Sequence, residues 1–375
     1  MLQKQDRISS SVFSLQDTLV LKGLALLILL SCHLFGRSKA AWSLFEYLPS
    51  LMVDGKPFIT AFTSAGCGKV CVDIFVILSG FGLNESYRRI YGDTCRPTQS
   101  IPFALKRMLK LLMGFWCVFF IIGGIFTALG KLDPVSTYGT GTEGVIAFIV
   151  DLFGLQDILY ELLHTATINS TWWYMSAILC YYCLFPLFRC LITWKYKALP
   201  FFLLLIINCV APDATYRQFS TGAFFYLAAF YLGMLCSEWK LLDKLKSLDG
   251  KSYWERLLCA VVAVVIGYLF TYSDRYRGEL FLAVSLMVLY SFLFIEPRGI
   301  LNRPVVRKTL ETLGAHSSNV FMFHTFFLFK YSNAVYFFRY PILVLFSFAL
   351  AMVTVSGLLE WVKKKTGISG LIKRI

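Results

Sequence analysis

Residues 19–36 read LVLKGLALLILLSCHLFG, an apolar run of membrane-spanning length with Lys22 near its start and His33 near its end. Ionisable residues are costly in the hydrocarbon core of a bilayer, so their presence in a span indicates a function by default. The two side chains are eleven residues apart, which places them on one helix face, about 16 Å apart along the axis. The run therefore predicts a membrane helix with a cation and a titratable base in one stripe.

The composition of the whole chain is also that of a membrane protein. Of its 375 residues, 57% are hydrophobic and 15% are charged, whereas a soluble domain has about 25% charged residues. Apolar runs close to 20 residues long recur along the sequence. No small-residue cleavage site follows the first run, so we expect a permanent span and not a signal peptide.

We predict an all-α fold, a polytopic helical bundle of about ten transmembrane helices. The expected core covers about residues 15–362 as a single domain, without a fused soluble domain. The predicted spans are 16–36, 68–86, 108–130, 172–192, 198–212, 222–237, 257–273, 279–296, 318–336 and 341–362.

The charge distribution predicts the orientation. The net charge is +14, but the basic residues lie in short loops between apolar runs, which is the positive-inside pattern and not a nucleic-acid-binding surface. With both termini in the cytoplasm, most of the 36 lysines and arginines face inward. A span at 145–163 would invert the later loops, so we expect a re-entrant or interfacial segment on the outer face. The basic tail 363–375 is expected to be cytoplasmic and to contact anionic lipid headgroups.

The sequence shows no spacing typical of a metal site, and we expect neither a metal nor a permanently bound cofactor. Most of the eleven cysteines lie within apolar runs, where they behave as small hydrophobic residues. Cys67 and Cys71 are close enough to pair, but spacing alone does not establish a disulfide.

His33 and Asp73 are the candidate catalytic residues. A neutral imidazole accepts a proton near neutral pH and can act as a general base; alternatively, His33 only hydrogen-bonds a neighbouring helix. Asp73 lies in VDIFVILSGFGL (residues 72–83), at about the depth of His33. A carboxylate beside an imidazole fixes its tautomer and raises its basicity, although Asp73 also suits the N-terminal end of a helix dipole.

Lys22, Arg107 and Lys110 are candidates for binding phosphate groups. Arg107 and Lys110 are spaced i, i+3 at the predicted inner start of the third span, so they share a helix face. Together with Lys22 they could form a cationic cluster for the phosphates of a ligand. The alternatives are snorkelling of Lys22 to the headgroups and ordinary positive-inside flanking by the other two.

The remaining candidates lie toward the predicted outer side. Trp172, Trp173 and Tyr174 open the fourth span and form either an aromatic belt or a platform on which a sugar stacks. His324 lies within the ninth span and is a second candidate site residue. Glu161 and His164 are spaced i, i+3 in the outer region, where they contact an acceptor or belong to an interfacial polar face.

These elements, in this order, resemble membrane acyltransferase family 3, which includes bacterial polysaccharide O-acetyltransferases. Four blocks carry the resemblance, and they run along nearly the whole chain. They contain Lys22, Gly23 and His33; Asp73, Phe75 and Ser79 to Phe81; Trp172 to Pro186; and Gly314, Ser317, His324 and Phe327. The family's first span has Arg, ten residues and His, and here Lys22 occupies the Arg position. Its Arg-x-x-Arg pair appears as Arg107 to Lys110, with lysine in the second position.

The resemblance implies an integral membrane O-acyltransferase of the cell or inner membrane. The donor would be cytoplasmic acyl-CoA, most simply acetyl-CoA, and the acceptor a hydroxyl of a cell-envelope glycan or sugar. His33 would act as general base or as acyl carrier. A homo-oligomer or a separate partner protein on the outer face would be compatible with it. A secondary transporter with His33 and Asp73 as a proton relay is the alternative, although no internal repeat typical of that class is found. A non-catalytic membrane scaffold is a third option.

Overall fold

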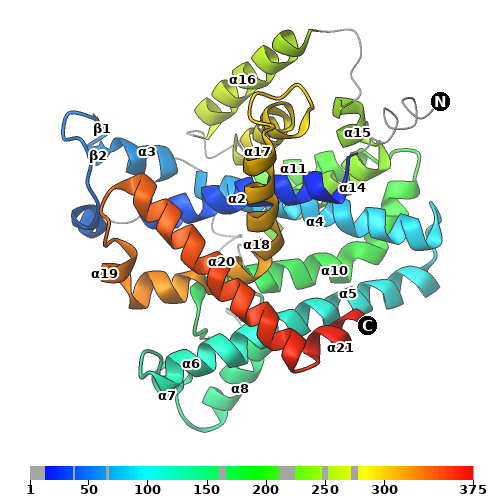
Figure 1. The fold of residues 1–375 in the computed structure, drawn as a ribbon. Coiled ribbons are helices and arrows are strands. Elements are labelled where there is room, and N and C mark those ends of the chain that lie inside the picture. Colours follow the sequence, from blue (N-terminus) through cyan, green and yellow to red (C-terminus); the bar gives the residue numbers. More distant parts are fainter. Residues whose placement is uncertain are drawn as a thin grey trace. The chain divides into compact units, whose positions relative to one another are not determined.

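The computed structural model describes residues 13–36, 39–64, 67–159, 166–210, 224–246, 252–271 and 278–374. The described chain is helical apart from one short hairpin (Figure 1). Strands β1 (Met52–Val53) and β2 (Lys56–Pro57) pair antiparallel. Asp54 and Gly55 between them both have positive φ, as a tight hairpin turn requires.

The helical elements are, in chain order, α2 (Leu15–Phe35), η1 (Lys39–Leu44), α3 (Phe58–Ser64), α4 (Cys67–Tyr91), α5 (Pro97–Cys117), η2 (Val118–Ile122), α6 (Gly123–Ala128), α7 (Pro134–Tyr138), α8 (Gly141–Leu152), η3 (Ser170–Trp172), α10 (Trp173–Thr193), α11 (Leu199–Val210), α14 (Leu227–Glu238), α15 (Leu241–Lys246), α16 (Tyr253–Phe270), α17 (Gly278–Tyr290), η4 (Ser291–Ile295), α18 (Pro304–Lys330), α19 (Ser332–Val335), α20 (Pro341–Lys365) and α21 (Ile368–Arg374). The chain divides into two compact units. Unit 1 comprises Met1–Ser86, Ala229–Ser317 and Phe338–Leu345, and unit 2 comprises Tyr87–Ala228, Ser318–Phe337 and Phe346–Ile375.

Seven helical segments of the described chain are long and apolar enough to cross a membrane. They are Leu15–Phe35, Lys69–Tyr91, Pro97–Ala128, Ser170–Thr193, Tyr253–Phe270, Gly278–Ile295 and Pro341–Lys365. Each coincides with one of the ten predicted spans, so the chain is all-helical and suited to a membrane, while the count of ten stays a prediction.

The other three predicted spans differ for identifiable reasons. Helices α11 and α14 are each 12 residues long as described, shorter than the roughly 20 residues that a bilayer needs. Helix α18 is 27 residues long, but buried polar side chains such as Asn319 and His324 lower its hydropathy. Helix α8 ends at Leu152 and the chain then turns, so the described part of 145–163 is too short to cross a bilayer.

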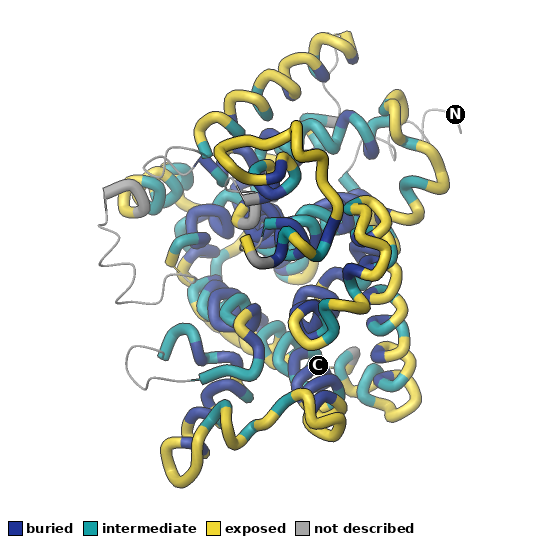
Figure 2. Tube along the Cα trace, turned by 90° about the vertical axis from the view of Figure 1, so that its left-hand side faces the viewer, coloured by how far each residue is buried: buried dark blue, intermediate teal, exposed yellow. Residues whose placement is uncertain are grey.

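Several helices contain long exposed stretches (Figure 2), and many of their exposed residues are large and apolar. Only 17% of the residues are buried in α16, and 33% in the most apolar 18-residue stretch of α20. Leu258 of α16 and Ile342 of α20 are 64% and 77% exposed. Water-soluble proteins rarely expose continuous apolar surface of this kind. These helix faces are therefore suited to contact lipid.

Glycines allow two pairs of helices in unit 1 to approach at backbone distance. A methyl group at Gly23 of α2 would collide with the Leu310 carbonyl of α18, and one at Gly314 of α18 would collide with the Leu19 carbonyl of α2. Helices α4 and α14 repeat this arrangement with Gly80 against Phe230 and Gly233 against Ile77. Small residues give membrane helices this close packing, because the hydrophobic effect contributes little between helices in lipid.

A disulfide and a buried arginine join the ends of two helical segments in unit 2. Cys95, in the turn before α5, is bonded to Cys190 near the end of α10. The neighbouring Arg189 is fully buried, and its guanidinium lies over the Tyr87 ring at 5.2 Å from the ring centroid. The disulfide was not predicted, because Cys95 and Cys190 are 95 residues apart in the sequence.

Asp151 is a buried carboxylate that joins α7, α8 and the segment before η3 in unit 2. Its Oδ2 accepts hydrogen bonds from the Tyr138 hydroxyl at 2.6 Å and from the Ile168 backbone N–H at 3.1 Å. Burial raises the pKa of Asp151 to about 6, although hydrogen bonds from Tyr138, Thr167 and Ile168 act in the opposite direction. The folded protein therefore binds the proton of this carboxyl more tightly than the unfolded chain does.

The first prediction compares two glycines on one helix. Gly80→Ala should destabilise the protein by about 1–3 kcal/mol, because the methyl group forces α4 away from α14. Gly82→Ala is the matched control, since its methyl group meets nothing within 4 Å, and it should be neutral or slightly stabilising. Thermal unfolding of both variants in detergent measures the difference, and equal melting temperatures would contradict the close crossing.

The second prediction concerns pH. Because the pKa of Asp151 in the folded protein lies above the ordinary value of 3.8, its stabilising contribution is present below about pH 4 and is lost as pH rises through about 6. Asp151→Asn removes the charge and keeps an acceptor oxygen. The melting temperature of this variant, relative to that of the wild type, should therefore rise between pH 4 and pH 7. The exposed Asp133, which caps α7, provides the control Asp133→Asn. A difference in melting temperature between the wild type and Asp151→Asn that does not change with pH would refute the prediction.

Candidate functional site

Helix α2 in unit 1 carries both Lys22 and His33. Its start is fixed by a capping box, in which Ser14 and Asp17 exchange side-chain-to-backbone hydrogen bonds of 2.8 and 3.2 Å. Both Lys22 and His33 are half-buried. No ion pair of Lys22 is found among the described residues, so its ammonium is not neutralised by a carboxylate there. A half-buried lysine of this kind can receive an anion.

The His33 end of α2 is covered by α3. Gly36 ends the helix, with its N–H donating to the Cys32 carbonyl at 2.9 Å. A methyl group at Gly36 would lie 3.5 Å from the carbonyl and hydroxyl oxygens of Thr63, and Thr60 and Thr63 of α3 are both buried. His33 is thus one turn before a close contact with a short helix that the sequence did not predict.

Asp73 lies on α4 of the same unit and is fully buried, with 0% of its surface exposed. Further along α4, Ser79 donates a hydrogen bond to the Phe75 carbonyl at 2.8 Å. A fully buried carboxylate is compatible with the orienting role that the sequence predicts, since ionised groups are rarely buried without a specific role. The direct pairing of Asp73 with His33 stays a prediction.

Arg107 and Lys110 lie on α5 of unit 2, and both are half-buried. The Arg107 guanidinium lies over the Phe103 ring, 5.1 Å from its centroid, which holds the side chain along the helix by a cation–π contact. Their spacing places them on one face of α5, as predicted. The grouping of this pair with Lys22 stays a prediction.

Trp172 is a core residue of unit 2. It is 1% exposed, and its indole N–H donates to the Met322 carbonyl at 2.8 Å. Phe119 stacks on it at a centroid distance of 5.2 Å, and Phe115 meets it edge-on at 4.8 Å. In the structure Trp172 therefore packs η3 against η2 and α18, and it presents no ring to a sugar or to the lipid headgroups.

Trp173 and Tyr174 are half-buried neighbours of Trp172. Trp173 stacks on Tyr226 at 5.7 Å, and Tyr174 lies against Phe321 of α18 at 4.6 Å. Part of each ring remains accessible, so a role of these two side chains in contacting an acceptor stays a prediction.

His324 is fully buried on α18. Its Nδ1 lies 2.9 Å from the Val320 carbonyl and 3.0 Å from the Phe321 carbonyl. Carbonyl oxygens only accept hydrogen bonds, so this geometry requires a proton on Nδ1 and leaves Nε2 as the nitrogen that can gain or lose one. Glu161 and His164, the two remaining candidates, lie outside the described residues.

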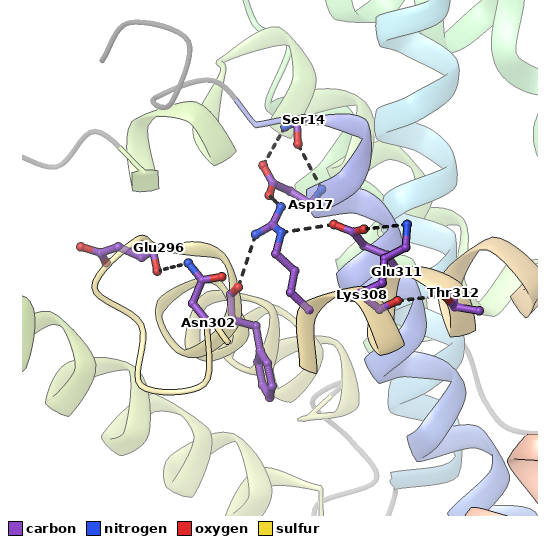
Figure 3. Close-up of polar contacts among 9 residues, drawn as sticks. Ser14, Asp17, Glu296, Asn302, Lys308, Glu311 and Thr312 are labelled. Carbon is purple, nitrogen blue, oxygen red and sulfur yellow. Dashed lines mark hydrogen bonds and ion pairs between the residues drawn. The ribbon is translucent and has the colours of Figure 1, made fainter. Parts of the chain in front are cut away.

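Sequence reasoning missed a polar cluster at the start of α2 (Figure 3). Arg307 of α18 donates to Asp17 at 2.6 Å and to Glu311 at 3.2 Å; we call these three residues the Asp17–Arg307–Glu311 clasp. The Ser14-x-x-Asp17 pattern indicates a capping box and could have identified the helix start. Nothing in the sequence indicates the pairing of Asp17 with a residue 290 positions away.

Comparison with protein families gives one match, an acyltransferase domain of the acyltransferase 3 family, over residues 19–361. Comparison with curated proteins and with solved structures gives no match. The family match starts in the second turn of α2 and ends near the end of α20, so it includes every candidate residue discussed above. The chain therefore belongs to the acyltransferase 3 family and is an acyl-transferring enzyme built from membrane helices.

Proposed function

We propose that the protein transfers an acyl group, most simply acetyl, from cytoplasmic acyl-CoA to a hydroxyl of a cell-envelope glycan or sugar. The observation that carries this proposal is the pair on α2. Lys22 lacks an ion pair among the described residues, and His33 follows it after ten residues on the same helix. Their axial separation of about 16 Å suits a ligand with phosphates at one end and a thioester at the other.

In this proposal Lys22, Arg107 and Lys110 bind the CoA phosphates. Lysine attracts phosphate as a point charge, whereas arginine binds it in a bidentate geometry. The thioester then lies near His33, within the membrane. No permanently bound cofactor is required, because acyl-CoA is a substrate.

His33 accepts the proton of the acceptor hydroxyl as that oxygen attacks the thioester carbonyl. The carbon–sulfur bond breaks, the new ester forms, and the proton passes from His33 to the sulfur, which leaves as the CoA thiol. Asp73 serves as the orienting carboxylate that fixes the imidazole tautomer. Transfer in two steps, with the acyl group first on the His33 ring, gives the same overall balance.

The distribution of basic residues supports an orientation with both termini in the cytoplasm. The Asp17 end of α2 then faces inward and the β1–β2 hairpin outward. The Cys95–Cys190 disulfide falls on the inner side in this orientation, where thiols are normally kept reduced. Orientation therefore needs its own test.

A cysteine at Asp54 tests the orientation. Asp54 is exposed at the tip of the β1–β2 hairpin, so a membrane-impermeant maleimide added to intact cells should label Asp54→Cys. Arg298→Cys, in the exposed turn between η4 and α18, should be labelled only after the membrane is opened. The reverse pattern would contradict the proposed orientation, and the wild type measures labelling of the native cysteines.

Replacement of His33 tests the chemistry. His33→Ala should lower acetyl transfer by at least about 100-fold, since it removes the general base, while leaving membrane insertion and melting temperature close to the wild type. Release of free CoA from acetyl-CoA in inverted membrane vesicles measures the activity. His324→Ala is the matched histidine variant and should retain more activity than His33→Ala. Wild-type activity of His33→Ala would exclude the mechanism.

A further inference from the structure

The guanidinium of Arg307 connects three segments of unit 1. Its Nη2 donates to Asp17 Oδ1 of α2 at 2.6 Å, its Nε to Glu311 Oε1 at 3.2 Å, and its Nη1 to the Phe294 carbonyl of η4 at 3.4 Å. Each of the three nitrogens thus has an acceptor. Arg307 is therefore occupied within the fold and is not available to bind phosphate.

Stability alone does not explain the ion pair between Asp17 and Arg307, because the pair is largely buried. The Asp17 side chain is 1% exposed and that of Arg307 24%. Removing two charges from water is costly, and an apolar pair of similar volume is often equally stable or more so. Buried ion pairs are better known for fixing the register of packed helices.

The contact surface between α2 and α18 has little tolerance for a change of register. Arg307, Leu310 and Gly314 are spaced by three and four residues and so lie on one face of α18. Leu310 and Gly314 meet the backbone of α2 at Gly23 and Leu19. These contacts lie beside Lys22 and only a few residues after Asp17. A shift or rotation of α2 against α18 would break the ion pair. It would also replace the glycines at the crossing by residues whose Cβ atoms collide with the backbone of the other helix.

We propose that Arg307 is a positioning residue for acyl transfer: through Asp17 it holds α2 at the depth and rotation at which Lys22 and His33 both reach the donor. The inference rests on the proposed function for the roles of those two residues. Because both lie on one rigid helix, a displaced α2 misplaces both. Loss of the clasp therefore changes donor binding and turnover together.

Arg307→Met tests the inference in the full-length protein in nanodiscs, with acetyl-CoA as the probe and release of CoA as the readout. We expect the KM for acetyl-CoA to rise about tenfold, because the displaced Lys22 loses a charge-assisted contact with a donor phosphate. We expect kcat to fall about 10- to 100-fold, as a displacement of about 1 Å gives. Arg307→Lys keeps the charge opposite Asp17 and should recover much of both parameters.

Arg256→Met is the matched control. Arg256 forms a similarly buried ion pair in unit 1, at 3.0 Å from Glu296, but it holds α16, which carries none of the proposed site residues. Arg256→Met should leave the KM for acetyl-CoA unchanged, although the melting temperature of this variant can fall.

The two claims fail separately. Full activity of His33→Ala would overturn the proposed function. With His33→Ala inactive, an unchanged KM and kcat in Arg307→Met would overturn the positioning role. So would a loss of folded protein with unchanged KM, or a KM raised equally in Arg256→Met, because each result would mean that Arg307 only supports the fold. If Arg307→Met does not fold, Asp17→Asn provides the same test, since it removes the charge that faces Arg307 and keeps the shape of the side chain, while its single oxygen can still accept from the Ser14 N–H of the cap.

Discussion

Burying an ionisable side chain in a membrane span costs free energy, and α2 carries this cost at Lys22, at His33 and, near its start, at Asp17. At Asp17 the cost is compensated by the ion pair with Arg307. The rest of unit 1 supports this helix. Glycine contacts hold α2 against α18, and a short helix covers its far end. A protein that needed only a stable bundle would gain nothing from a half-buried lysine and histidine on one stripe.

Close backbone contact explains how such a helix can stay in place. Lipid provides little hydrophobic drive for helix association, so packing and polar contacts must provide it. Gly23 and Gly314 bring α2 and α18 together without side chains between them, and Gly80 and Gly233 do the same for α4 and α14. Asn84 strengthens the second crossing, with its amide donating to Ser237 at 2.9 Å. The helix of His33 and the helix of Asp73 are thus each fixed by glycines and by a polar contact.

Much of this fold could be predicted from local sequence. The length of the apolar runs predicted α2, α16 and α20 to within a few residues. Helices α16 and α20 leave most of their residues unburied and are uniformly apolar, as contact with lipid requires, whereas α2 is largely buried and was recognised by its apolar length alone. Helix α18 was harder, because its buried Asn319 and His324 look unfavourable in lipid and are satisfied only inside the protein. The position of Trp172 near the start of a predicted span favours an aromatic belt or a sugar-stacking platform, because aromatic residues there are usually interfacial. Its burial depends on Phe119 and Met322, which only the folded chain brings together.

The candidate site also contains some features that follow from local sequence and others that depend on contacts between distant segments. The shared helix face of Lys22 and His33 on α2, and of Arg107 and Lys110 on α5, follows from the helical period, whereas the roles of these residues stay predictions. The Asp17–Arg307–Glu311 clasp depends on a contact between segments 290 residues apart, which no local pattern contains.

The central claim is that the donor lies along α2, with its phosphates at Lys22 and its thioester at His33. A cryo-electron microscopy structure with a non-hydrolysable thioether analogue of acetyl-CoA tests it directly. We predict density for the phosphates beside Lys22 and the thioether sulfur near the His33 imidazole, separated along the helix axis by about 16 Å. An analogue bound with its sulfur beside His324, or with its phosphates away from Lys22, would contradict the account.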